Sequence, residues 1–408
     1  MKLIFKKVLS PGVLVLTDQV IFSGGNFLST LLLARILNVK DFGIYSAVVL
    51  HGYLLMSLGN ALCIQPLQVA TRRQQGSIVY SSFLFFLQLA FMVFALGFSL
   101  LFASSFGLLH LFNAQALALL AGILLQDFIR KFLLSRQRFL LALVLDATVT
   151  IPQLLILITG IFSITDSVKL MQFFCIAYFL PVFAFVIWLK PTLKHMALWP
   201  GLLIRQFRQS GWYSVVAFIQ WGASNVFVVS VGVFISMEAL GAFRLIQSLF
   251  GVLNILFQSF ENYVLPSASR LYHQSAEASK HYIQNMGRRS ILLIGVLLAV
   301  LFAFAGPVLN TASGGRYTGY AYVLRGMCLL YFVLFISYPV RLSIRVLLLN
   351  RDFFIGYLLS FLFSLAFFNL FIRQWMLGGV VAGLITSQLI MLGFWLYRLN
   401  KNKFYLWK

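Results

Sequence analysis

The chain has 408 residues, of which 61% are hydrophobic and 10% charged, and 43 of them are Phe. This composition excludes a soluble globular domain and indicates that a lipid bilayer is the solvent. The formal charge of +22 does not indicate nucleic-acid binding, because the Lys and Arg residues stand between apolar segments and form no basic stripe with interleaved aromatic residues. We therefore expect membrane lipids, and no nucleic acid, among the partners.

Apolar runs of about 20 residues, long enough to cross the hydrocarbon core, predict twelve transmembrane helices. The first six are expected over 12–34, 42–66, 77–102, 114–134, 139–162 and 168–189. The second six are expected over 212–235, 241–265, 290–312, 318–340, 353–373 and 376–398. The predicted fold class is an all-α integral membrane protein. The charged start of the chain resembles a signal peptide, but no small-residue cleavage site follows, so we expect an uncleaved first span.

The positive charges predict the orientation in the membrane. With the N-terminus in the cytoplasm, most of the 31 Lys and Arg residues fall in cytoplasmic segments, including the pairs Arg72-Arg73 and Arg288-Arg289. The reverse topology would break the positive-inside rule. We expect both termini to be cytoplasmic.

The longest break between spans divides the chain. We expect an N-terminal six-helix lobe over 1–189, a cytoplasmic amphipathic linker over 190–211, a C-terminal six-helix lobe over 212–398 and a cytoplasmic tail over 399–408. The lobes look like repeats, because the segment 37–45 resembles 235–243 and Pro66 has a counterpart in Pro266. Parallel repeats are typical of secondary transporters, whose substrate sites lie between the repeats.

A stripe of polar and small residues marks one face of the eighth predicted span. Its members recur at intervals of three and four: Arg244, Gln247, Gly251, Asn254, Gln258 and Glu261. Such a face must be turned toward protein or water, because polar groups facing lipid lose their hydrogen bonds. We interpret it as the wall of a cavity, with helix-to-helix packing as the alternative.

A second stripe lies on the first span. It contains Gln19, Ser23, Asn26 and Thr30, with Asp18 beside it and Gly24-Gly25 allowing close approach or a bend. The second and seventh predicted spans also have polar faces, and the simplest arrangement that hides all four faces is a lumen lined by the first two helices of each lobe. Further ionisable residues within or near the membrane are functional candidates; they are Asp127, Arg130, Asp146 and Arg325.

Signatures of catalysis are missing. The sequence has no Gly-rich phosphate-binding loop, no metal-ligand spacing among its five His and three Cys residues, and no triad on a soluble domain. We predict that the chain is not an enzyme and has no catalytic residues, metal or cofactor.

Three segments resemble bacterial polysaccharide and O-antigen flippases of the Wzx type, which belong to the multidrug/oligosaccharidyl-lipid/polysaccharide exporter superfamily. The segments are Leu33-Ala34-Arg35 with 42–46, 240–266 including the whole polar stripe, and 315–326. The resemblance implies a V-shaped pair of six-helix lobes. These would move undecaprenyl-diphosphate-linked oligosaccharide across the bacterial plasma membrane by alternating access, for O-antigen, capsule or exopolysaccharide synthesis.

Under this resemblance, lipid-linked oligosaccharide is the expected partner, and other polysaccharide assembly proteins are candidate partners. Arg244 and Arg325 are the expected diphosphate contacts. The expected hydrogen-bonding partners of the sugar hydroxyls are Asn26, Gln247, Asn254 and Gln258. Asp18, Asp146 and Glu261 are candidates for exchanging a proton or balancing charge.

Three alternatives remain open. A multidrug or cation exporter of the same superfamily should have more buried acids than the nine acidic residues of this chain supply. A multi-span glycan polymerase or glycosyltransferase would usually carry a large hydrophilic loop and no repeat. A non-transporting scaffold of a polysaccharide assembly complex would tolerate substitutions of the cavity residues.

Overall fold

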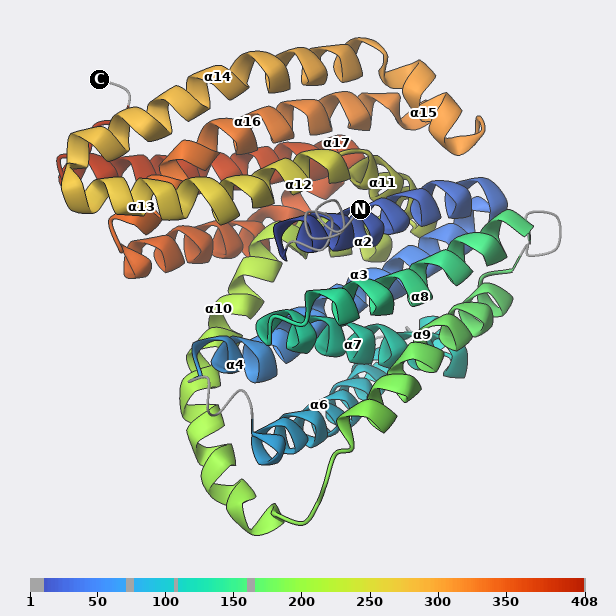
Figure 1. The fold of residues 1–408 in the computed structure, drawn as a ribbon. Helices are drawn as coiled ribbons and strands as arrows, with labels where there is room; N and C mark the ends of the chain where they lie inside the picture. The colour runs from blue at the N-terminus through green and yellow to red at the C-terminus, as the bar shows by residue number, and fades with distance from the viewer. Residues whose placement is uncertain (1–10, 71–76, 106–108, 160–165, 407–408) are drawn as a thin grey trace, which may run out of the picture. The chain divides into compact units, whose positions relative to one another are not determined.

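The computed structural model describes residues 11–70, 77–105, 109–159 and 166–406. The described residues form helices and connecting turns, with no β-strand among them (Figure 1). Two compact units divide the chain, Met1–Phe218 and Ile219–Lys408, here called unit 1 and unit 2.

Unit 1 is a bundle of long helices joined by short turns. Its elements are α2 (Pro11–Ile36), α3 (Val39–Gly59), η1 (Asn60–Ile64), α4 (Gln65–Val69), α6 (Ile78–Ser105), η2 (Leu109–Leu111), α7 (Ala114–Ser135), α8 (Phe139–Thr159), α9 (Ser167–Leu189), η3 (Met196–Leu198) and the first part of α10 (Trp199–Phe234). Helix α2 packs on α8, and α7 packs on α9, α3 and α8 (Figure 1). Helix α7 is thus the centre of the unit, and most of its side chains are buried.

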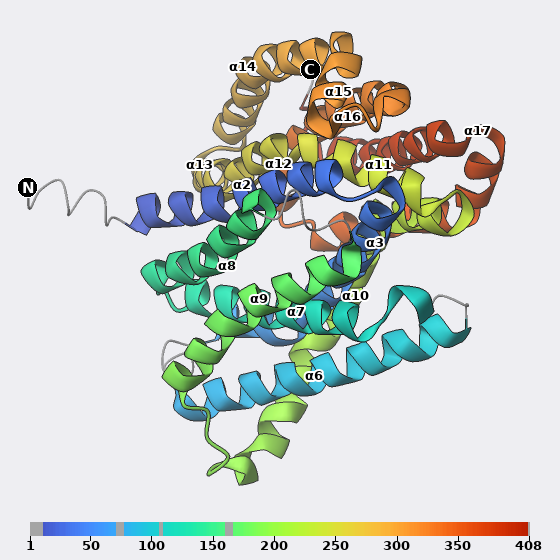
Figure 2. The ribbon, with the colours of Figure 1, turned by 90° about the vertical axis from the view of Figure 1, so that its right-hand side faces the viewer.

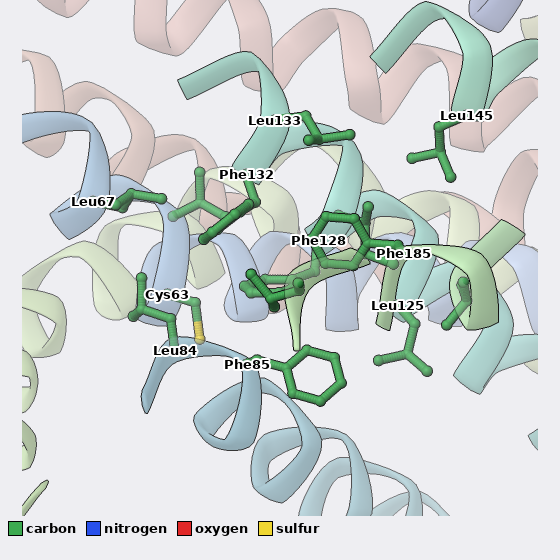
Figure 3. Packing of buried hydrophobic residues seen from close by; sticks show 14 of the residues in the cluster. Cys63, Leu67, Leu84, Phe85, Leu125, Phe128, Phe132, Leu133, Leu145 and Phe185 are labelled. Atoms are coloured by element: carbon green, nitrogen blue, oxygen red, sulfur yellow. The ribbon is translucent and has the colours of Figure 1, made fainter. Parts of the chain in front are cut away.

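Polar side chains at the starts of helices define their boundaries. Asn38 accepts a hydrogen bond from the backbone N–H of Asp41, and Asn113 does the same for Ala116. Such N-caps satisfy backbone donors that have no partner within the helix. Inside the bundle, Phe128, Phe132 and Phe185 pack with apolar residues of α4, α6 and α8 into one core (Figure 3).

Unit 2 contains the counterparts of these helices. Its elements are the rest of α10, α11 (Met237–Leu249), α12 (Gly251–Ser259), η4 (Phe260–Val264), α13 (Leu265–Gln274), α14 (Ala276–Ala303), α15 (Ala305–Ser313), η5 (Thr318–Tyr320), α16 (Ala321–Val346) and α17 (Asn350–Lys401). Helices α14 and α17 both pack against α16 (Figure 2). Helix α17 changes direction at Met376, where φ is 50°. A Cβ on Gly379 would lie 1.9 Å from the carbonyl oxygen of Phe371, so this return needs glycine.

The predicted spans all have helical counterparts. Eight segments of the described chain are long and apolar enough to cross a membrane, and α17, which contains two predicted spans, is one of them. The remaining predicted spans correspond to α2, α7 and the broken helix from α11 to α13. The chain is a multi-pass membrane protein. The eighth span differs from its prediction because it is interrupted at Phe250 and contains the π-helical turn η4.

The repeat predicted from sequence is visible in local structure. Asn38 caps α3 and Ser236 caps α11, each by accepting from the backbone N–H three residues later. A π-helical turn follows in both units, η1 and η4, and each is succeeded at once by a helix with proline in its first turn. These matched irregularities indicate that the two units share one architecture.

The predicted linker is partly continuous with a span. Its residues from Trp199 onward form the start of α10, where Ile204 and Phe207 are exposed. Gln206 is buried, donates to the carbonyl oxygen of Leu62 in η1 and accepts from the Tyr80 hydroxyl. This side chain attaches the start of α10 to the rest of unit 1.

Candidate functional site

A buried ion cluster lies in the core of unit 1, formed by side chains from three helices. Arg130 of α7 donates from Nη2 to Asp18 of α2 at 2.7 Å and from Nε to Asp146 of α8 at 2.5 Å. The three side chains are 8%, 2% and 0% exposed. Two carboxylates therefore share one guanidinium away from water, and the fully ionised cluster carries one net negative charge.

The two carboxylates are held unequally. Asp146 also accepts a hydrogen bond from the Gln126 amide at 2.7 Å, so both of its oxygens are bonded. Asp18 bonds Arg130 through one oxygen, and its buried Oδ1 has no partner in the structure. An unsatisfied buried carboxylate oxygen is costly, and Asp18 thus lacks a hydrogen bond of the kind that Gln126 gives to Asp146.

Close packing of α2 on α8 brings these charges together. A Cβ added to Gly25 would lie 2.0 Å from Cγ2 of Thr150, whereas Gly24 has nothing within 4 Å. The predicted close approach thus occurs at Gly25. On the same face of α2 as Asp18 and Gly25, Phe22 lies beneath the Arg130 guanidinium, whose carbon is 4.1 Å from the centroid of the Phe22 ring.

A second polar group of unit 1 lies at the π-helical turn η1. Asn60, its first residue, donates to Asp127 at 2.9 Å, and Lys131 pairs with the same carboxylate at 3.0 Å. Asp127 thus pairs with Lys131, while Arg130, on the same helix, pairs with Asp18 and Asp146. π-helical turns inside helices are frequent at functional sites.

Among the described residues of unit 2, the largest ion cluster is centred on Glu261 of η4. Its carboxylate bonds Arg341 at 2.8 Å and Arg345 at 2.9 Å, both on α16, and accepts from the Tyr338 hydroxyl at 3.2 Å. The side chains of Glu261, Arg341 and Arg345 are 26%, 29% and 35% exposed. One carboxylate here holds two guanidiniums, with partial access for solvent.

The residues predicted to bind substrate occupy different settings. Arg244 is half-buried on α11 and donates to the Gln247 side chain at 2.8 Å, one turn away. Asn254 is exposed on α12 and exchanges hydrogen bonds with the Tyr331 hydroxyl at 3.3–3.4 Å. Gln258 belongs to α12, but its side chain lies outside those described. Asn26 and Arg325 are exposed on α2 and α16.

Sequence reasoning named some of these groups and missed others. Asp18, Asp146 and Glu261 were predicted to exchange a proton or balance charge, which stays a prediction; in the structure each lies in an ion pair with arginine. The pairing of Asp18 and Asp146 with Arg130 was not predicted, because the three residues lie far apart in the sequence. Arg341 and Arg345 were missed, since they read as topology charges; their spacing of one helical turn was the available signal. Within the described residues, no group of three or more His, Cys, Asp or Glu could hold a metal ion.

Comparisons with known proteins agree on the architecture. No protein-family model and no curated protein matches the sequence. Among solved structures, an inward-facing multidrug resistance MATE family transporter of the MOP superfamily matches with a TM-score of 0.74, 13% identity and coverage of 94% of this chain and 95% of that one. The lipid II flippase MurJ, in an inward closed conformation, matches with a TM-score of 0.72, 12% identity and coverage of 96% and 87%.

A MOP superfamily transporter from Pyrococcus furiosus, described as having a binding pocket of reverse polarity, matches with a TM-score of 0.56, 14% identity and coverage of 96% and 92%. This chain shares the helical fold of these three structures. At identities this low, the similarity shows a shared fold and nothing about the substrate. The substrate has to be inferred from the residues of this chain. The predicted fold class, an all-α membrane protein of about twelve helices, is thereby confirmed.

Proposed function

We propose that this chain is a flippase that moves lipid-linked oligosaccharide, carried on undecaprenyl diphosphate, across the bacterial plasma membrane by alternating access. Its termini would be cytoplasmic. One observation carries the proposal: the carboxylates inside the transmembrane helices already bond cations. They are Asp18, Asp127, Asp146 and Glu261. At the partly exposed cluster of unit 2, a substrate would therefore meet two guanidiniums against one carboxylate.

This balance fits an anionic substrate with a polar glycan. A diphosphate is recognised by guanidinium groups through charge-assisted and bidentate hydrogen bonds. Arg244 and Arg325 remain our proposed diphosphate contacts, and Asn26, Gln247, Asn254 and Gln258 the proposed sugar contacts. Of these, Asn26, Asn254 and Arg325 are exposed on the surfaces of their units, and so accessible to a ligand.

The buried cluster of unit 1 supplies a candidate for coupling. With all three groups ionised, Asp18, Arg130 and Asp146 carry a net charge of −1 in a site from which water is nearly excluded. An uncompensated buried charge is expensive, so binding of one proton or cation would lower the cost. We propose that the pair Asp18 and Asp146 takes it together, with the unpartnered oxygen of Asp18 as the open contact.

The competing function is export of organic cations, which the fold likeness to a multidrug resistance transporter favours. Such a pocket would need an accessible, unneutralised carboxylate. Glu261, in the partly exposed cluster of unit 2, is engaged by two arginines, and the net negative cluster of unit 1 is buried. The two functions differ in the sign of the charge that the substrate carries.

Inactivating the gene in its own host separates them. A flippase predicts loss of surface glycan together with accumulation of lipid-linked oligosaccharide, both restored by the wild-type chain. Unchanged surface glycan with increased sensitivity to lipophilic cations would overturn the proposal in favour of an exporter. Arg244→Ala and Arg244→Lys, compared at equal membrane levels of protein, then show whether this guanidinium takes part.

A further inference from the structure

The two units carry an arginine at matching positions. The turn after α7 contains Gln137 with φ 58°, and the turn after α16 contains Leu348 with φ 54°. Both turns are closed by the same pattern of backbone hydrogen bonds. Arg130 precedes the first turn by as many residues as Arg341 precedes the second. The two arginines are therefore structural counterparts in the repeat.

Their surroundings have opposite charge balance. Arg130 lies between two carboxylates, and its side chain is 8% exposed. Arg341 shares the single carboxylate of Glu261 with Arg345. Each of these three side chains is at least three times as exposed as that of Arg130. Fully ionised, the first cluster has a net charge of −1 and the second a net charge of +1. The corresponding site of unit 2 is thus more exposed and has a net positive charge.

The cationic site has more donors than its carboxylate can use. Each guanidinium offers five N–H groups, and Glu261 takes one close contact from each arginine and one hydrogen bond from Tyr338. Nε of Arg341 is buried and has no hydrogen-bond partner in the structure. An unpartnered buried donor beside a partly open cluster is a free contact for an anionic oxygen.

The walls of the site are aromatic and hold the polar groups in place. The Tyr338 ring stacks on Phe257 with centroids 4.5 Å apart, and the Arg341 guanidinium lies 5.4 Å from the Tyr338 ring. Phe353, at the start of α17, lies within 6.0 Å of both guanidiniums. Packed rings restrict the rotamers of the arginines and lower the local dielectric, which strengthens their attraction for an anion.

A carboxylate bridging two guanidiniums occupies the place that a phosphate group would take. Both are anions with several oxygens, and both accept paired N–H donors from arginine. We propose that Arg341 and Arg345 form a diphosphate-binding site in unit 2, in which Glu261 is an internal anion that gives up guanidinium contacts when the ligand's phosphates arrive. This inference rests on the proposed function for the identity of the carrier lipid and adds two residues to the diphosphate site.

Binding by the purified full-length protein in detergent tests the assignment. Farnesyl diphosphate serves as the lipid diphosphate, with inorganic pyrophosphate and phosphatidylglycerol as separate probes of free phosphate and of phospholipid headgroups. Arg345→Gln should weaken farnesyl diphosphate binding about tenfold or more by removing charge-assisted hydrogen bonds. Arg345→Lys keeps the charge but loses the paired N–H donors of the guanidinium, so its affinity for farnesyl diphosphate should lie between those of Arg345→Gln and the wild type. Glu261→Gln should bind several-fold more tightly because the competing anion is gone.

Two control variants separate the site from general effects of charge and stability. Arg351→Gln removes an exposed arginine of the same unit, and Arg398→Gln breaks the ion pair with Asp352; neither should change farnesyl diphosphate binding. Equal affinity in the wild type and both Arg345 variants, or no binding by the wild type, overturns the inference. Phosphatidylglycerol binding that responds to Arg345 while farnesyl diphosphate binding does not also overturns it, in favour of a structural lipid site. The gene inactivation described above judges the flippase separately, because its outcome does not depend on this cluster.

Discussion

The ion clusters of unit 1 and unit 2 show how one architecture can hold charge in two ways. In unit 1, Arg130 neutralises part of two buried carboxylates and joins α2, α7 and α8. In unit 2, Glu261 joins η4 to α16 through two guanidiniums whose side chains are partly exposed. Ion pairs stripped of water respond strongly to loss of one partner, whereas hydrated pairs respond weakly. We therefore expect the first cluster to govern folding and the second to govern binding.

Arg130→Gln should give the largest loss of stability. Its removal leaves two buried carboxylates without a cation, and breaking a buried pair in this way costs about 3–5 kcal/mol. We expect a marked fall in the midpoint of thermal unfolding in detergent and little protein in the membrane. The triple variant that also carries Asp18→Asn and Asp146→Asn should recover much of the loss. If Arg130→Gln alone were as stable as the wild type, the buried ion pairs would not stabilise unit 1 as proposed.

Asp146→Asn should cost more stability than Asp18→Asn. Asp146 uses both oxygens, one with Arg130 and one with Gln126, while Asp18 uses one. In Asp146→Asn, the new amide N–H would face one of these two donors, and neither could form a hydrogen bond there. Leaving buried polar groups unpaired costs about 1–3 kcal/mol of stability. Thermal unfolding of the two variants in parallel measures the difference, and the reverse order would show that Asp18 is the better-held acid.

Gly25→Ala tests whether close packing of α2 on α8 positions the unit 1 cluster. The added Cβ would collide with the Thr150 side chain, so we expect the variant to be less stable than the wild type by about 1–3 kcal/mol. Adding Thr150→Ala should relieve the collision, and Gly24→Ala is the matched control because it has open space. Equal unfolding temperatures for the Gly24 and Gly25 variants would remove this contact from the account.

Arg345→Gln should have the smallest effect on stability. Partly exposed pairs contribute up to about 1 kcal/mol, and salt weakens them further. We expect an unfolding temperature close to that of the wild type, with the remaining difference shrinking as salt is raised. A loss as large as that of Arg130→Gln would show that the unit 2 cluster is chiefly a structural lock.

Much of the architecture could be predicted from sequence because membrane insertion leaves a long-range signal. Apolar runs identify the spans, and the paired prolines Pro66 and Pro266 indicate the repeat. The interruption of the eighth span at Phe250 and the π-helical turn η4 were not predictable, since an extra residue in one turn leaves the hydrophobic pattern almost unchanged.

The candidate sites were less accessible to sequence reasoning. Asp18, Arg130 and Asp146 could each be recognised as unusual in an apolar span, but their pairing depends on how three helices pack. Arg341 and Arg345 lie where cytoplasmic charges are expected, so the positive-inside pattern concealed their contact with Glu261. Charge near a span end is thus ambiguous until its partner is known.

The leaflet that holds the lipid-linked oligosaccharide tests the central claim most directly. Membranes of the host would be compared with and without the chain, using a membrane-impermeant glycosidase to measure the fraction of lipid-linked oligosaccharide exposed on the periplasmic side. The account predicts that this fraction falls sharply when the chain is absent and returns with the wild-type protein. An unchanged fraction, with the total amount of lipid-linked oligosaccharide also unchanged, would contradict the proposal that this protein is a flippase.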